Sequence, residues 1–136
     1  MESRAPGMTL VLDSSVVLAY LLDESGRDIA EATIAAEARI SSVNLAEVMG
    51  RLVRDGADPA TSADVLLALP LIVVPMDAQL AITAGAMIPQ TRPLGLSLGD
   101  RACLALAKRE NVPAVTGDRA WLRAGPLVGV EVRLIR

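Results

Sequence analysis

Four acidic side chains, Asp13, Glu47, Asp100 and Asp118, stand where an apolar strand-like segment gives way to a helix or where a helix makes its first turns. Strand ends and helix beginnings of an α/β protein gather at one edge of the sheet. We therefore expect these distant acids to meet in one cleft. Carboxylates held that close repel one another unless a divalent cation lies among them. The arrangement predicts a Mg²⁺ or Mn²⁺ site, and metal-assisted phosphodiester hydrolysis is a chemistry that suits it.

Helix capping is the competing interpretation at Asp13 and Asp118, because Asp is a favoured N-cap residue. Asp13 directly follows the apolar run MTLVL, and Asp118 follows PAVT and one Gly. Taken alone, Asp13 is better explained as a cap. Function is slightly favoured at Asp118, because Thr116 is placed to hydrogen-bond a neighbouring carboxylate or a substrate phosphate.

The other two acids have the spacing of a capping box, in which the residue at N3 reaches back to the N-cap. Asn44 and Glu47 form one such pair, and Ser97 and Asp100 form the other. Apolar neighbours around Glu47 argue against an ordinary surface position, and Gly99 allows another group to approach Asp100 closely. Capping explains each acid separately but not the common position of all four, which favours a shared site.

Three further charged residues near these motifs receive other roles. Asp77, in PMDAQLA, is interpreted as an ordinary N-cap outside the metal site. Arg101 is expected to form a structural ion pair. Arg119 is left open between pairing with a carboxylate and binding phosphate.

Composition narrows the chemistry further. The chain has 136 residues and is 52% hydrophobic, yet it contains no Phe, one Tyr and one Trp, so its core must consist of Leu, Val, Ile and Ala. The absence of His excludes Ser-His-Asp triads and His-ligated zinc. The single Cys103 excludes intrachain disulfides and indicates a reducing, cytoplasmic setting. The net charge of −3 does not indicate nucleic-acid binding, but four site acids contribute to it and a bound cation would reverse the local field.

Hydrophobic patterning predicts alternating strands and helices, which is typical of βαβ units around a mainly parallel sheet. We expect one domain over residues 8–136 after a disordered leader at 1–7, and no apolar run reaches the roughly 20 residues that span a bilayer. Strands are predicted over 8–12, 39–42, 71–74, 113–116 and 130–135. Helices are predicted over 14–22, 27–38, 44–54, 58–69, 77–87, 97–110 and 118–123, and the longest loop over 88–96.

The segments VLDSSVVLAYLLDE, SSVNLAEV, LSLGDRACLALA and VTGDRAW together resemble PIN-domain proteins. Among these, size and motif wording are most similar to the VapC toxins of bacterial toxin–antitoxin pairs. The likeness extends from about Thr9 to Arg136 with the motifs in family order. It implies a three-layer α/β/α sandwich whose mainly parallel sheet has four to five strands. It also implies an RNA endonuclease that is active with Mg²⁺ or Mn²⁺.

The resemblance also implies site residues and partners. The family's acidic quartet corresponds to Asp13, Glu47, Asp100 and Asp118, its small hydroxyl residue to Thr116, and the polar residue after the first acid to Ser15. Expected partners are an RNA substrate, a cognate VapB-type antitoxin and a second copy in a homodimer. Within the quartet, we assign Asp13 and Asp100 as the direct ligands of a first ion. Asp118 would ligate the ion or orient its water, and Glu47 would act through water or on a second ion.

Three alternatives stay open. The first is a housekeeping PIN nuclease for RNA processing or decay. The second is a phosphoryl-transfer enzyme with Asp13 as nucleophile, which is disfavoured because Ser15 stands where such enzymes usually carry a second acid. The third is a non-catalytic binding module whose acids are only helix caps.

Overall fold

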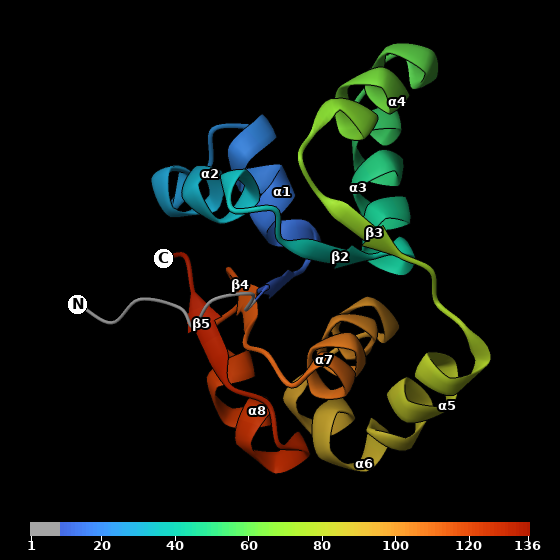
Figure 1. Cartoon of the computed structure of the whole chain (residues 1–136), viewed down its shortest axis with the longest axis vertical. Helices are drawn as coiled ribbons and strands as arrows, with labels where there is room; N and C mark the ends of the chain where they lie inside the picture. Colours follow the sequence, from blue (N-terminus) through green and yellow to red (C-terminus); the bar gives the residue numbers. More distant parts are fainter. Residues whose placement is uncertain (1–8) are drawn as a thin grey trace.

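The computed structural model describes residues 9–136, so the leader predicted at 1–7 lies outside the described residues. Five parallel strands form one sheet in the order β3-β2-β1-β4-β5 (Figure 1). This confirms the predicted parallel sheet of four to five strands. The strands are β1 (Val11–Leu12), β2 (Arg39–Ser41), β3 (Ile72–Val74), β4 (Ala114–Thr116) and β5 (Val132–Leu134).

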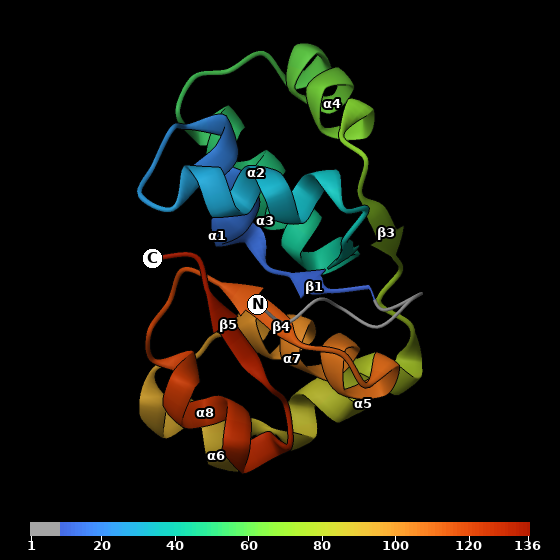
Figure 2. The ribbon, with the colours of Figure 1, turned by 60° about the vertical axis from the view of Figure 1, so that its left-hand side comes forward.

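Helices cover both faces of the sheet and complete the predicted α/β/α layers. The group α1 to α4 lies on one face and the group α5 to α8 on the other, as the two views in Figures 1 and 2 agree. The first group is α1 (Ser14–Leu21), α2 (Arg27–Ala35), α3 (Ser42–Arg54) and α4 (Pro59–Ala68). The second is α5 (Ala78–Ala86), α6 (Ile88–Thr91), the 3₁₀ turn η1 (Arg92–Leu94), α7 (Leu98–Glu110) and α8 (Trp121–Val128).

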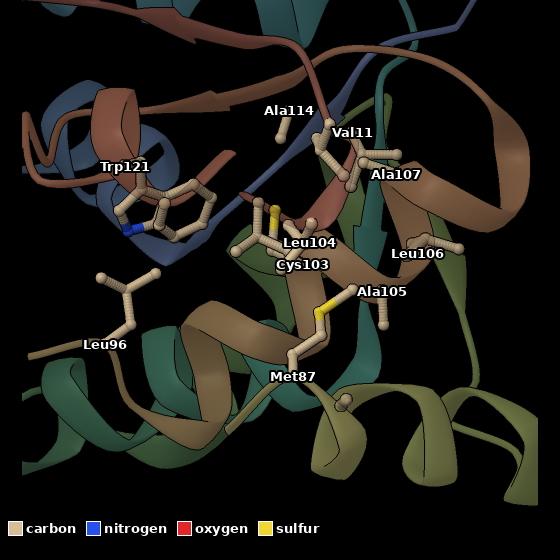
Figure 3. Close-up of a cluster of buried hydrophobic side chains, with 14 of the residues drawn as sticks. Val11, Met87, Leu96, Cys103, Leu104, Ala105, Leu106, Ala107, Ala114 and Trp121 are labelled. Atoms are coloured by element: carbon tan, nitrogen blue, oxygen red, sulfur yellow. The ribbon is translucent and has the colours of Figure 1, made fainter. Parts of the chain in front are cut away.

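The alternation of side chains along each strand supplies two cores. Val11 and Ala114 belong to the cluster under α5, α7 and α8, whereas Leu12 and Val115 belong to the cluster under α1 to α4. Trp121 is fully buried in the first cluster, and Figure 3 shows it with Cys103 and Leu104. Cys103 and Trp121 are therefore core residues.

Two predicted elements were wrong. The segment 88–96, predicted as a loop, contains α6 and η1, because Pro89 and Pro93 occupy first-turn positions that helices tolerate. The helix predicted at 118–123 begins later and is longer, running as α8 from Trp121 to Val128. Gly125 and Pro126 are poor helix formers, but the burial of Trp121 and Val128 overrides that local preference.

The order of the strands places a topological switch point between β1 and β4. From β1 the chain builds outward to β2 and β3 on one side, then returns to add β4 and β5 on the other. Crevices at the carboxyl ends of strands beside such a switch point are the usual ligand sites of open α/β sheets. No helix formed by residues 9–136 combines the length and apolarity needed to cross a bilayer.

Candidate metal centre

Asp13 directly follows β1, and Thr116 is the last residue of β4; these two strands flank the switch point. In the β1–β4 register Leu12 lies opposite Val115, which brings the next residues of the two strands, Asp13 and Thr116, together. The Thr116 hydroxyl donates a hydrogen bond of 2.7 Å to Oδ2 of Asp13. The first of the four candidate acids is thereby joined to the segment that carries the fourth, Asp118.

Asp13 is almost completely buried, with 3% of its surface exposed. The Ser15 hydroxyl donates to its Oδ1 at 2.5 Å, and the Val16 amide donates to the same oxygen at 3.3 Å. Its predicted role as the N-cap of α1 is thus confirmed. Burial raises the pKa of Asp13 to about 6, and the negative charge of Asp100 adds to this rise, while the hydroxyl hydrogen bonds oppose it.

Ser15 and Thr116 form a network that connects Asp13 to the turn after β4. The Gly117 amide donates to Ser15 Oγ at 2.8 Å, and the Asp118 amide donates to Thr116 Oγ1 at 3.1 Å. Each hydroxyl therefore accepts from the turn and donates to the buried carboxylate. The two residues that the family resemblance suggested as supporting residues are both in direct contact with Asp13.

Glu47 is held at the amino-terminal end of α7 by Asn44, which was predicted to be a helix N-cap. Asn44 Nδ2 donates to Glu47 Oε1 at 2.9 Å and to the Gly99 carbonyl at 3.0 Å. A Cβ atom at Gly99 would overlap the Glu47 carboxylate, so this glycine makes room for the acid beside Asp100. The predicted N-cap role of Asn44 was wrong: α3 begins one turn earlier with Ser41 as its cap, and Asn44 is buried within the helix.

The predicted capping box of Ser97 and Asp100 is confirmed, and the other acids also affect the pKa of Asp100. Its Oδ2 accepts from the Ser97 amide at 2.8 Å, and both halves of the box are present. Partial burial raises its pKa, the Ser97 hydrogen bonds lower it, and the charges of Asp118 and Glu47 raise it further. The buried thiol of Cys103, three residues on, has a raised pKa mainly from burial, to which Asp13, Asp100 and Glu47 contribute.

No lysine or arginine of residues 9–136 forms an ion pair with any of the four acids. The expected ion pair of Arg101 is absent from this part of the chain, because its guanidinium donates to the Leu96 carbonyl at 3.0 Å instead. Asp77, by contrast, caps α5 and pairs with Arg109 at 3.0 Å. The assignment of Asp77 to an ordinary capping role agrees with this environment.

The four carboxylates share one edge of the sheet, but their side chains do not converge on a single point. Across residues 9–136, no three acidic or cysteine side chains stand close enough, as placed, to chelate an ion. Each acid instead accepts a hydrogen bond from a local partner: Ser15, Asn44, Ser97 and the Ala120 amide respectively.

Two contacts at this site were not predicted from the sequence. Asn44 bridges Glu47 and the Gly99 carbonyl, and the guanidinium of Arg136 packs on Gly117. The signal for Asn44 was its place three residues before Glu47, where it is one helical turn away on the same face. For Arg136 the sequence offers no such signal, because only the tertiary fold brings β5 beside the turn after β4.

The protein is thus an α/β protein with a five-stranded parallel sheet, and four acids lie around the central switch point of that sheet. The sequence model of the family described as "PIN domain" matches residues 10–126. The chain belongs to the PIN-domain family. Among curated proteins, none matches the chain.

Solved structures of low sequence identity share the fold. DNA-bound VapBC from Salmonella typhimurium has 20% identity and a TM-score of 0.73, covering 95% of this chain and 99% of that one. VapBC2 from Rickettsia felis, bound to a promoter DNA fragment, has 18% identity and a TM-score of 0.71, covering 93% and 98%. VapC20 from Mycobacterium tuberculosis, described as a sarcin-ricin loop cleaving toxin, has 18% identity and a TM-score of 0.70, covering 86% and 95%.

Proposed function

We propose that this PIN-domain protein is an endoribonuclease that depends on Mg²⁺ or Mn²⁺ and acts as the toxin of a toxin–antitoxin pair. One observation carries the proposal: four acids from distant parts of the chain lie around the switch point, and no basic side chain of residues 9–136 neutralises them. Uncompensated carboxylates at the usual ligand crevice of an α/β sheet are costly for stability, which favours a functional reason for keeping them.

The residues fit a hard divalent cation. All donors are carboxylate oxygens, which Mg²⁺ and Mn²⁺ prefer over the nitrogen and sulfur ligands that this site lacks. Within residues 9–136, one oxygen each of Glu47, Asp100 and Asp118 accepts no hydrogen bond and remains available. A bound cation would also offset the burial that raises the pKa of Asp13.

A cation bound there would supply charge neutralisation and a water of lowered pKa for attack on phosphorus. The chain itself supplies the positioning. Ser15 and Thr116 hold the buried Asp13 in one orientation, and Asp13 and Asp100 are the proposed direct ligands. Asp118 is exposed and is assigned either to ligating the ion or to orienting its water. Glu47, held by Asn44, is assigned to an outer or second-ion role.

RNA is proposed as the substrate on the strength of family membership and of the shared fold with VapC20, a protein described as cleaving the sarcin-ricin loop. Hydrolysis by a water would leave a 5′-phosphate and a 3′-hydroxyl. The test is incubation of the purified protein with total cellular RNA, with and without Mn²⁺, beside the Asp100→Asn variant, followed by end mapping. Fragments ending in 2′,3′-cyclic phosphate would contradict this mechanism.

An apolar groove between α3 and α4 supports the proposal of an antitoxin partner. The groove has a volume of about 310 Å³ and is lined by apolar side chains including Leu45, Met49 and Leu66, beside Leu67, which is 76% exposed. Amphipathic helical segments dock into grooves of this kind. Neutralisation of growth arrest by a small neighbouring gene would support the toxin role, whereas cleavage without such a gene would favour a housekeeping nuclease.

A homodimer is also proposed. Ile82 on α5 and Leu127 on α8 are 73% and 59% exposed and line the same surface groove. Large apolar side chains left in solvent at one place are typical of association surfaces. Light scattering on the purified protein, compared with the Ile82→Glu variant, measures the oligomeric state and the contribution of this surface.

A further inference from the structure

Arg136, which follows β5, is packed between two turns at the carboxyl edge of the sheet. Its Nη1 donates to the Ser25 carbonyl at 2.8 Å, in the turn between α1 and α2. On the other side, a Cβ atom added at Gly117 would lie only 2.7 Å from Cζ and Nη2 of Arg136. The guanidinium therefore rests on the Gly117 backbone, and Figures 1 and 2 both show the chain end beside the α1–α2 turn.

Backbone packing holds this arginine in place. A Cβ atom at Gly26 would overlap the carbonyl of Ile135, so the α1–α2 turn is in close contact with the residue before Arg136. Gly26 has a φ of +89°, a conformation that favours glycine. In addition, Arg119 Nη1 donates to the Arg136 carbonyl at 3.2 Å. The position of the guanidinium is thus defined by contacts on both sides.

The turn on which the guanidinium rests also carries one of the four acids and contacts another through Ser15. Gly117 directly precedes Asp118. The Gly117 amide donates to Ser15 Oγ at 2.8 Å, and the Ser15 hydroxyl donates to Asp13. Yet neither Arg136 nor Arg119 pairs with a carboxylate of residues 9–136. Both side chains are exposed, and the hydrogen bonds found for each guanidinium go to backbone oxygens.

We propose that Arg136, assisted by Arg119, binds a backbone phosphate of the RNA next to the phosphate cleaved at the acidic site. This inference rests on the proposed function. A polyanion approaching four carboxylates is repelled, and a fixed cation at the edge of the site offsets that repulsion for one orientation of the strand. The planar guanidinium matches phosphate oxygens in a way that an ammonium group does not. Arg136 is therefore a substrate-positioning residue.

The experiment measures RNA binding separately from cleavage. A fluorescein-labelled RNA hairpin is titrated with protein by fluorescence anisotropy across about 50–200 mM salt, with every protein carrying Asp100→Asn so that the probe stays intact. Arg136→Gln is expected to raise the Kd about tenfold and to reduce the salt-dependence slope by roughly 0.7 to 0.9, the value of one lost phosphate contact. Arg136→Lys should keep the slope but weaken binding. Arg133→Gln, the matched control, removes a charge on β5 that pairs with Glu131 and should change neither quantity.

A second variant tests the geometry without removing charge. Gly117→Ala should displace the guanidinium and weaken binding when Arg136 is present, yet add little when Arg136 is already Gln. An equal effect of Gly117→Ala in both backgrounds, or an Arg136→Gln protein that binds with the original slope, overturns the proposal.

Mn²⁺-dependent cleavage by the protein with Asp100 intact separates this inference from the proposed function. Cleavage together with an unchanged Arg136→Gln slope rejects the phosphate contact alone. A reduced slope without cleavage rejects the nuclease alone. Absence of both binding and cleavage rejects both proposals.

Discussion

The hydroxyl of Thr116 donates a hydrogen bond of 2.7 Å to Oδ2 of Asp13, although the two residues are 103 positions apart in the sequence. This bond spans the switch point between β1 and β4, and the same hydroxyl accepts from the Asp118 amide at 3.1 Å. A single side chain thus orients the buried acid and the turn that carries an exposed one. Its removal should disturb both without touching any carboxylate.

Replacement of Thr116 by Val tests that relationship. Val keeps the shape but leaves the Asp118 amide without its hydroxyl acceptor and removes a hydrogen bond that lowers the pKa of Asp13. We expect a loss of about 1–3 kcal/mol in the free energy of unfolding, the usual cost of an unsatisfied buried group. Mn²⁺ affinity measured by isothermal titration should also fall. Thr116→Ser, which restores the hydroxyl, should recover most of both; an equally defective Ser variant would argue for packing instead.

Asp13 should make the stability of the metal-free protein depend on pH. Its pKa is raised from 3.8 to about 6 on folding, so the folded state holds the proton more tightly. Between about pH 4 and pH 6 the folded protein binds more protons than the unfolded chain, and stability therefore falls as the pH rises. The full shift corresponds to about 3 kcal/mol. Urea unfolding at pH 4 and pH 7 should show Asp13→Asn gaining relative to wild type at the higher pH; a constant difference would contradict the raised pKa.

Mn²⁺ binding should show the opposite pH dependence. Ligation requires ionised Asp13, so affinity should increase by up to about tenfold per pH unit below pH 6 and level off above it. Stabilisation by saturating Mn²⁺, measured as a rise in Tm, should accordingly be larger at pH 7 than at pH 5. Affinity that is independent of pH over this range would place the ion away from Asp13.

Asp100→Asn should abolish Mn²⁺-dependent RNA cleavage, with a loss of at least about a hundredfold, because a proposed ligand is exchanged for a neutral group of the same shape. Removal of the cation with EDTA should have the same effect on the wild type. Asp77→Asn is the matched control, since Asp77 also follows a strand and caps a helix but pairs with Arg109 at 3.0 Å. Comparable losses in both variants would remove the distinction between site acids and ordinary caps.

Gly99→Ala should impair cleavage while leaving the fold intact. The added methyl group overlaps the Glu47 carboxylate, the far end of an exposed side chain that can move away by giving up its hydrogen bond from Asn44. Gly50→Ala, also within a helix, meets nothing within 4 Å and should be neutral or stabilising by about 0.5–1 kcal/mol. Cleavage rates and circular dichroism melts of the pair check this. An unimpaired Gly99→Ala enzyme would show that the observed position of Glu47 is not needed for cleavage.

Much of the fold could be predicted from local patterns, and so could the capping roles of Asp13 and Asp100. Short apolar runs before Asp13 and Thr116 are strands, and Ser97 with Asp100 is a capping box, because periodicity and capping depend on residues only a few positions apart. The end of α8 could not be predicted. There, local breakers at Gly125 and Pro126 competed with the burial of Trp121, and burial is a tertiary quantity.

The sequence by itself singled out the candidate site residues: four acids in a chain without His, near two hydroxyl residues. Only the tertiary structure decided their relations. It made Asn44 a bridge between Glu47 and Gly99 instead of a cap, and it placed Arg136 against Gly117. The physical reason is that the Asn44–Gly99 and Arg136–Gly117 contacts join segments far apart in the chain. Their formation depends on the strand order and on which face each helix buries, and no local pattern encodes either.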